Sequence, residues 1–66
     1  MNLSCRQALA QAESAKAVNL SYRPSSAYAG AAKWLETNGY LTLGTSGGFW
    51  INQRGERELA AQRVSR

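Results

Sequence analysis

The residue types that most often carry enzyme chemistry are scarce in this 66-residue chain, which contains no histidine, one cysteine and four carboxylate side chains. Cys5 has no evident base to activate its thiol, and no second cysteine or histidine with which to hold a metal ion. The glycine-rich segment 44–48 lies between two expected strands, whereas a phosphate-cradling loop joins a strand to a helix. We therefore expect no catalysis, no metal and no cofactor, and we expect Cys5 to be a buried apolar residue.

Positive charge is the most informative chemical property of the chain. Eight Lys and Arg residues against four Asp and Glu residues give a net charge of +4. On so small a surface this excess favours an anionic partner, most commonly nucleic acid, with a membrane surface or an acidic protein patch as the alternatives. The cations form no continuous block, so folding must gather them if they act together. They are Arg6, Lys16, Arg23, Lys33, Arg54, Arg57, Arg63 and Arg66.

Length and composition indicate one small globular domain, residues 1–66. A domain of this size buries only about 60% of the surface that its unfolded chain exposes, so it folds alone with little margin. Residues 1–12 include Arg6 and lack the unbroken apolar run of a secretory signal. No stretch approaches the roughly 18 apolar residues that span a bilayer. The sequence therefore predicts a reduced, cytoplasmic protein without a membrane partner.

The segment 3–19 predicts helix, because it is rich in alanine, the strongest helix former. Ser4 followed by Gln7 matches a capping box. Whether the segment forms one helix or two short helices is open. We expect a thin apolar stripe to face the core, made of Leu3, Leu9, Ala12 and Val18.

Residues 27–38 predict a second helix. Ser25 or Ser26 suits its N-cap, and Gly39 suits the left-handed turn that commonly ends a helix. Helical spacing turns one face toward the core and the other toward solvent. The expected inward residues are Tyr28, Ala32 and Leu35. The expected outward residues are Ser25, Ser26, Ala27, Ala29, Gly30 and Lys33.

A hairpin and a third helix follow. The segments 40–43 and 49–51 alternate along the strand, and the flexible tip 44–48 joins them. Asn52 is the expected cap of a final helix that extends to about residue 64, with Leu59, Ala60 and Val64 facing the core. The expected fold class is mainly α with a small antiparallel β-hairpin, an α+β domain of three helices and two strands.

Two local patterns in this order of elements resemble the winged helix-turn-helix family. Residues 34–41, WLETNGYL, resemble the end of a recognition helix that runs into the first strand of the wing. Residues 51–59, INQRGEREL, resemble the second wing strand entering the closing helix, with Asn52 where threonine is usual. The match covers residues 25–59. It implies a winged-helix fold and binding to double-stranded DNA, with helix 27–38 in the major groove and the wing 44–48 on the neighbouring backbone.

The resemblance implies DNA contacts from helix 27–38, the wing and the residues beside them. The outward face of that helix lacks forked side chains that read bases, so we expect phosphate contacts to dominate. The expected set is Arg23, Ser25, Ser26, Ala29, Gly30, Lys33, Thr45, Ser46 and Arg54. The implied function is a small transcription regulator that binds DNA with full or partial sequence specificity, as a homodimer on two half-sites.

Trp34 keeps a second hypothesis open, because the family usually has a polar residue at this position. It packs in the core or stands partly exposed, and an exposed aromatic on a small domain often belongs to a partner surface. In that case Trp34 and the Ala29–Gly30 surface would form the binding face of an interaction module, such as a small inhibitor or adaptor, with a protein partner. A third hypothesis is a single-strand binder that stacks bases on exposed aromatic rings.

Overall fold

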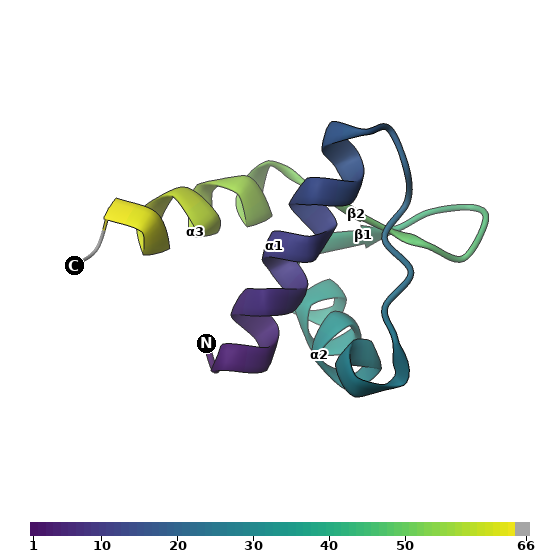
Figure 1. Ribbon diagram of the computed structural model, residues 1–66, viewed down its shortest axis with the longest axis horizontal. Coiled ribbons are helices and arrows are strands. Elements are labelled where there is room, and N and C mark those ends of the chain that lie inside the picture. Colours follow the sequence, from purple (N-terminus) through teal and green to yellow (C-terminus); the bar gives the residue numbers. More distant parts are fainter. Residues whose placement is uncertain (65–66) are drawn as a thin grey trace.

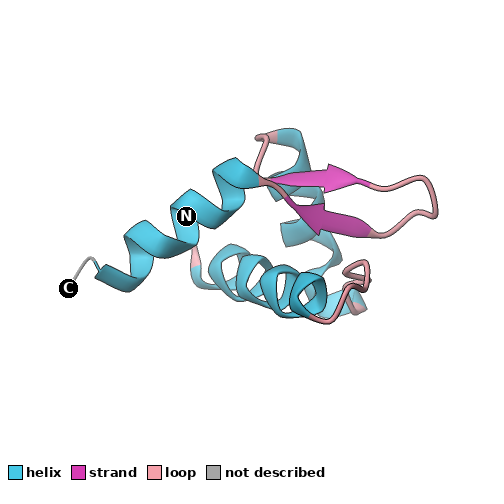
Figure 2. Ribbon diagram, turned by 90° about the horizontal axis from the view of Figure 1, so that it is seen from above, coloured by secondary structure: helices cyan, strands magenta, loops and turns pink. Residues whose placement is uncertain are grey.

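The computed structural model describes residues 1–64, which form three helices and one two-stranded antiparallel sheet. The order is α1 (Leu3–Ala17), α2 (Ser26–Thr37), β1 (Leu41–Leu43), β2 (Phe49–Ile51) and α3 (Gln53–Val64). In Figure 1, α1 passes in front of the sheet, α2 lies below it, and α3 and the hairpin tip extend in opposite directions. Figure 2 shows the same opposition from above. This arrangement confirms the expected α+β fold class.

Residues 3–17 form one helix, and its N-cap is Asn2. The Asn2 Oδ1 accepts a hydrogen bond of 2.9 Å from the backbone N–H of Cys5. Ser4 lies inside the first turn, so the predicted capping box at Ser4 and Gln7 was wrong. Asparagine is as good an N-cap as serine, and here it stands immediately before the first helical residue.

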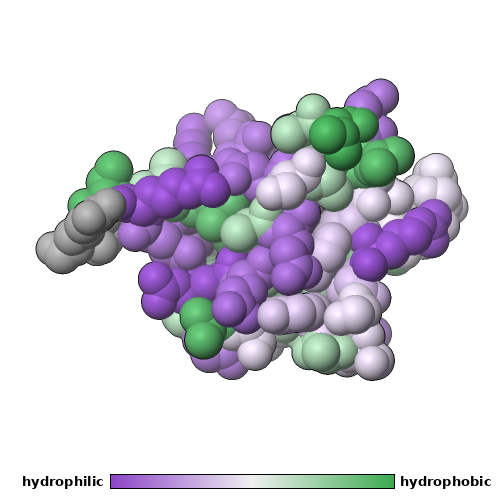
Figure 3. Space-filling model, in the orientation of Figure 1, coloured by the Kyte–Doolittle hydropathy of each residue, from purple (hydrophilic) through white to green (hydrophobic). Residues whose placement is uncertain are grey.

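A left-handed residue, Asn19 with φ of 62°, ends α1. Its N–H donates to the Lys16 carbonyl at 2.9 Å, and the next N–H, that of Leu20, donates to the Ala15 carbonyl at 2.9 Å. This pair of bonds is the Schellman motif, which satisfies carbonyls at a helix end. The turn leaves Leu20 and Val18 exposed, so the expectation that Val18 faces the core was wrong. Figure 3 shows a hydrophobic patch at the upper right, where α1 ends in Figure 1.

The core lies between α1, α2 and the sheet. Leu9 and Leu35 are its largest fully buried side chains, and burying each contributes roughly 1.5–3 kcal/mol. Three buried alanines let the helices approach closely. Ala60 and Val64 were expected in the core but are exposed, because α3 points away from the body. Leu3, the first residue of α1, was also expected in the core and is exposed. The buried apolar residues are Cys5, Ala8, Leu9, Ala12, Tyr22, Ala32, Leu35, Leu41, Ile51 and Leu59.

A third extended segment lies along the outer edge of the hairpin. Strands β1 and β2 pair with Leu41 opposite Ile51 and Leu43 opposite Phe49. Tyr22 forms an isolated antiparallel bridge with Phe49 through two backbone hydrogen bonds of 2.7 and 2.8 Å. The bridge fastens the chain between α1 and α2 to β2.

Asn52 joins the two turns at the base of the hairpin. Its Oδ1 accepts a hydrogen bond from the Gly55 N–H at 2.9 Å, which caps α3 as expected, and its Nδ2 donates to the Gly39 carbonyl at 2.8 Å. Gly39 has φ of 87°, the left-handed conformation predicted for the end of α2. Gly55 approaches the preceding turn so closely that a Cβ would collide with the Tyr40 carbonyl oxygen.

Candidate nucleic-acid interface

The outward face of α2 is open and made of small residues. All six residues expected to point outward are exposed, while Ala32 and Leu35 are buried and Tyr28 is half-buried. A Cβ added to Gly30 would meet no atom within 4 Å, so the helix backbone itself is accessible there. Figure 3 shows pale, weakly polar surface at the lower right, where Figure 1 places the first turns of α2. Lys33 supplies the one positive charge of this helix.

The N-terminus of α2 has polar groups that are free to bind an external acceptor or donor. Ser25 is the N-cap with extended backbone angles, φ −68° and ψ 169°, but its hydroxyl makes no capping hydrogen bond. Ser26 follows it and is also exposed. Two serine hydroxyls therefore stand beside the first-turn amides of the helix, where the helix dipole favours negative charge.

Arg23 supplies the cation that the hairpin tip lacks in its own sequence. Its Nη2 donates a hydrogen bond of 3.0 Å to the Ser46 carbonyl. The bridge at Tyr22 is the cause, since it holds the preceding residue against β2 and directs Arg23 along the hairpin. Arg23, Ser46 and Thr45 are all exposed. The fold thus joins three residues of the expected set into one positively charged tip.

Arg54 occupies the other end of the hairpin, beside the turn that ends α2. Its guanidinium carbon lies 4.7 Å from the centroid of the Tyr40 ring. The Tyr40 ring in turn stacks with Trp34, with 6.2 Å between centroids and 13° between planes. The Arg54 side chain also lies against Gly39. Arg23 therefore precedes the start of α2 and Arg54 packs beside its end, so two cations bracket the exposed helix.

Some cations of the described residues form ion pairs with carboxylates, and others do not. Lys16 and Glu56 form an ion pair of 3.2 Å between α1 and α3, and Arg63 pairs with Glu13 between the same helices. The hydrogen bond from Arg63 to Glu13 raises the pKa of the Arg63 guanidinium. Within residues 1–64, five cations form no ion pair: Arg6, Arg23, Lys33, Arg54 and Arg57. Arg66 lies outside the described residues. The cations of α2 and the hairpin thus have no carboxylate partner among the described residues.

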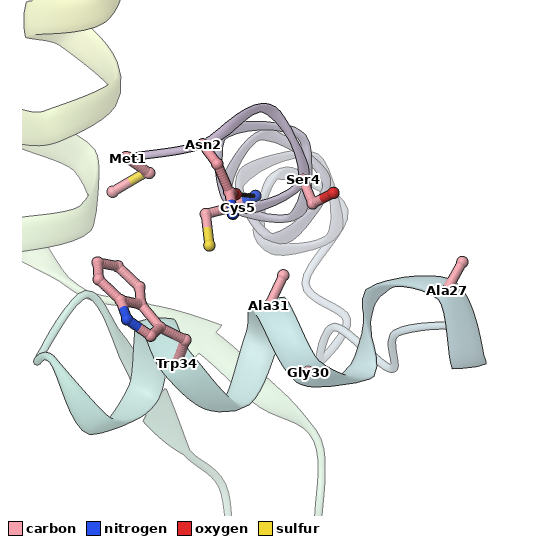
Figure 4. A pocket seen from close by; sticks show the side chains of 8 residues that line it. All are labelled: Met1, Asn2, Ser4, Cys5, Ala27, Gly30, Ala31 and Trp34. Atoms are coloured by element: carbon pink, nitrogen blue, oxygen red, sulfur yellow. Dashed lines mark hydrogen bonds between the residues drawn. The ribbon is translucent and has the colours of Figure 1, made fainter.

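Trp34 is partly outside the core, with 45% of its surface exposed. It lines a hollow of about 460 Å³ between the N-terminus of α1 and α2. Figure 4 shows its indole ring on the same side as the side chains of Met1 and Cys5, with Gly30 and Ala31 along the helix. Of the surface proposed for a protein partner, Gly30 lines this hollow and Ala29 does not. Cys5 also lines this hollow and is buried, as expected.

Two glutamines on α1 hold the interface elements in place, and sequence reasoning missed them. Gln11 accepts a hydrogen bond of 2.6 Å from the Tyr22 hydroxyl, and Gln7 accepts one of 2.8 Å from the Tyr28 hydroxyl. Burial raises the pKa of Tyr22, and the neighbouring Tyr28 raises it further. The signal available in the sequence was the spacing of four between the glutamines, which puts them on one face of a helix.

The described residues contain no group of three or more His, Cys, Asp or Glu placed to hold a metal ion. None of the three helices is both long enough and apolar enough to cross a bilayer, as far as residues 1–64 are concerned. No family model, curated protein or solved structure matches the chain.

Proposed function

We propose that this chain binds double-stranded DNA through α2 and the hairpin and acts as a small transcription regulator. The observation that carries the proposal is the bracketing of an exposed, small-residue helix by unpaired cations, Arg23 at its start and Arg54 at its end. Lys33 adds a third cation on the helix itself. The resemblance of residues 25–59 to winged helix-turn-helix proteins supports the same function.

The chemistry of α2 favours close approach over base reading. A major groove about 12 Å wide admits a helix, and Ala29 and Gly30 keep the backbone of α2 near the base edges. Forked donors and acceptors that discriminate base pairs are missing from this face. Affinity therefore comes mainly from phosphate contacts, with modest sequence discrimination from the groove shape and the helix start.

The hairpin contributes a second contact to the DNA backbone. The tip formed by Arg23, Thr45 and Ser46 presents one guanidinium and two hydroxyls, all of which bind phosphate oxygens. With α2 in the groove, this tip reaches the adjacent backbone. A homodimer would place two such units on two half-sites, and occupancy near a promoter would block or recruit polymerase.

Fluorescence anisotropy with labelled mixed-sequence duplexes tests this function across a range of salt concentrations. We expect Arg23→Ala, Lys33→Ala and Arg54→Ala each to weaken binding and to lower the slope of log K against log salt by about 0.9. Arg6→Ala is the matched control, because it removes an equal, unpaired charge from the first turns of α1. Absence of binding, or an equal loss in the Arg6 variant, would contradict the proposal.

A protein-interaction module is the second candidate, and the exposure of Trp34 beside a 460 Å³ hollow favours it. A partner side chain inserted there would contact the indole, the Met1 thioether and the bare backbone at Gly30. Ser4→Trp, which places a bulky side chain in the lining of the hollow and leaves the Trp34–Tyr40 stack unchanged, separates the two functions. Intact DNA binding with loss of a co-purified protein partner supports the module, whereas unchanged co-purification argues against it.

A further inference from the structure

We infer that Tyr40 is a positioning residue for DNA binding, because its ring holds the Arg54 guanidinium in the orientation that contacts a backbone phosphate. The inference rests on the proposed DNA-binding function. It assigns a role to the stack of Arg54, Tyr40 and Trp34, which that function does not by itself require. Sequence patterns gave no role to Tyr40.

The geometry of the stack carries the argument. The guanidinium carbon of Arg54 lies 4.7 Å from the Tyr40 centroid, within the range of a cation–π contact. Tyr40 stacks in turn with Trp34, so its ring is restrained by a second aromatic side chain. A cation–π contact does not use up a hydrogen-bond acceptor, so it restrains the guanidinium while its N–H groups can still donate to a phosphate.

Hydrogen bonds beside the stack fix the backbone segments that carry Tyr40 and Arg54. Asn52 binds the Gly39 carbonyl and caps α3 through Gly55, so the backbone segments that carry Tyr40 and Arg54 are joined directly. The Arg54 guanidinium makes no hydrogen bond and no ion pair to any of the described residues. The guanidinium therefore has no intramolecular acceptor among the described residues and can donate to an external one, while its position is set by the ring.

Preorganisation explains why such an arrangement strengthens binding. An unrestrained arginine loses much rotamer freedom when it binds a phosphate, and a guanidinium already stacked on a ring loses less. Tyr40→Leu removes the ring and keeps an apolar side chain, whereas Tyr40→Phe keeps the ring and removes only the hydroxyl. We expect Tyr40→Leu to weaken duplex binding about two- to fivefold, the range of an exposed cation–π contact, and Tyr40→Phe to bind as the unsubstituted chain does.

A double-mutant cycle on duplex affinity tests the inference. Tyr40→Leu, Arg54→Ala and their combination are measured by anisotropy at one salt concentration, with the far-UV circular dichroism melt of each variant confirming that it is folded. If Tyr40 acts through Arg54, the Leu substitution has no further effect in the Arg54→Ala background. In NMR spectra, the Arg54 side-chain protons should shift upfield over the ring and lose this shift in Tyr40→Leu.

The outcomes separate this inference from the function on which it rests. An equal loss from Tyr40→Leu with and without Arg54 would mean that Tyr40 is merely structural and would overturn the inference. The inference also falls if Tyr40→Leu has no effect, or if Arg54→Ala leaves affinity unchanged while the duplex is still bound. If the unsubstituted chain binds no duplex, the proposed function fails first and the positioning role fails with it.

Discussion

Replacing Gly30 by alanine should stabilise the fold and weaken DNA binding at the same time. Gly30 is exposed in the middle of α2, and an added Cβ would meet no atom within 4 Å. Its φ is not positive, since Gly39 and Gly47 are the glycines with positive φ among the described residues. Alanine therefore fits without strain, and its advantage in helix propensity is about 1 kcal/mol. In a domain of this size that raises the melting temperature by roughly 4–8 °C.

The same methyl group should be unfavourable against a duplex. If the backbone of α2 at Gly30 approaches the DNA as proposed, the methyl fills space that the close contact needs, and overpacking costs about 1 kcal/mol or more. We expect a rise in Kd of about fivefold or more. The rise in melting temperature and the loss of affinity both come from the same added methyl group, so a single variant tests both.

Circular dichroism melts and duplex anisotropy, performed on the same preparation, provide the two readouts. Ala61→Gly is the matched control, because it makes the opposite change at an exposed helical position in α3, outside the proposed interface. It should lower the melting temperature by a similar amount without weakening binding beyond its effect on folding. A Gly30→Ala protein that melts higher and binds as before would refute the close approach of α2 to DNA. A lower melting temperature would refute the argument that Gly30 is unconstrained.

Three further predictions concern the fold that supports the interface. Gly55→Ala should destabilise the domain by about 1–3 kcal/mol in urea unfolding, because the new Cβ collides with a backbone carbonyl; stability equal to that of the unsubstituted chain would contradict this. Asn52→Ala should cost more than Asn2→Ala, which loses a single cap of about 1 kcal/mol, because the Asn52 amide also binds the turn after α2. Tyr22→Phe should change the pH dependence of stability: the folded pKa of Tyr22 is raised above its ordinary value of 10.0, so its contribution is complete below pH 10 and is lost as pH rises through the folded pKa. Melts on both sides of pH 10 should show a smaller alkaline loss in the Phe variant, and identical profiles would exclude this contribution.

Features set by neighbouring residues could be predicted from the sequence. The outward face of α2 followed from the helical spacing of Ala32 and Leu35, since period alone decides which residues share a face. The left-handed turn at Gly39 and the cap at Asn52 followed from local backbone chemistry in the same way. These local rules were sufficient to predict the fold class and the residues that α2 exposes at the candidate site.

Features set by the path of the chain could not be predicted. Arg23 meets Ser46 because an isolated bridge lies along β2, and one bridge has no periodic signature. Arg54 contacts Tyr40 because the turn after α2 packs against the turn before α3. The identity of either residue alone does not predict this contact. The expectation that Val64 faces the core was wrong for a related reason. Helical periodicity identifies the apolar side of a helix, but it does not say whether another element covers that side.

The single bridge between Tyr22 and Phe49 also has a consequence for motion. Two backbone hydrogen bonds hold this segment to the sheet, so both amides should become exposed in one local opening and give the same opening free energy in hydrogen–deuterium exchange. The same opening removes the support that directs Arg23 to Ser46. Local opening at this one pair of residues should therefore release the Arg23 side chain from the hairpin tip and free the segment that leads into α2 at the same time.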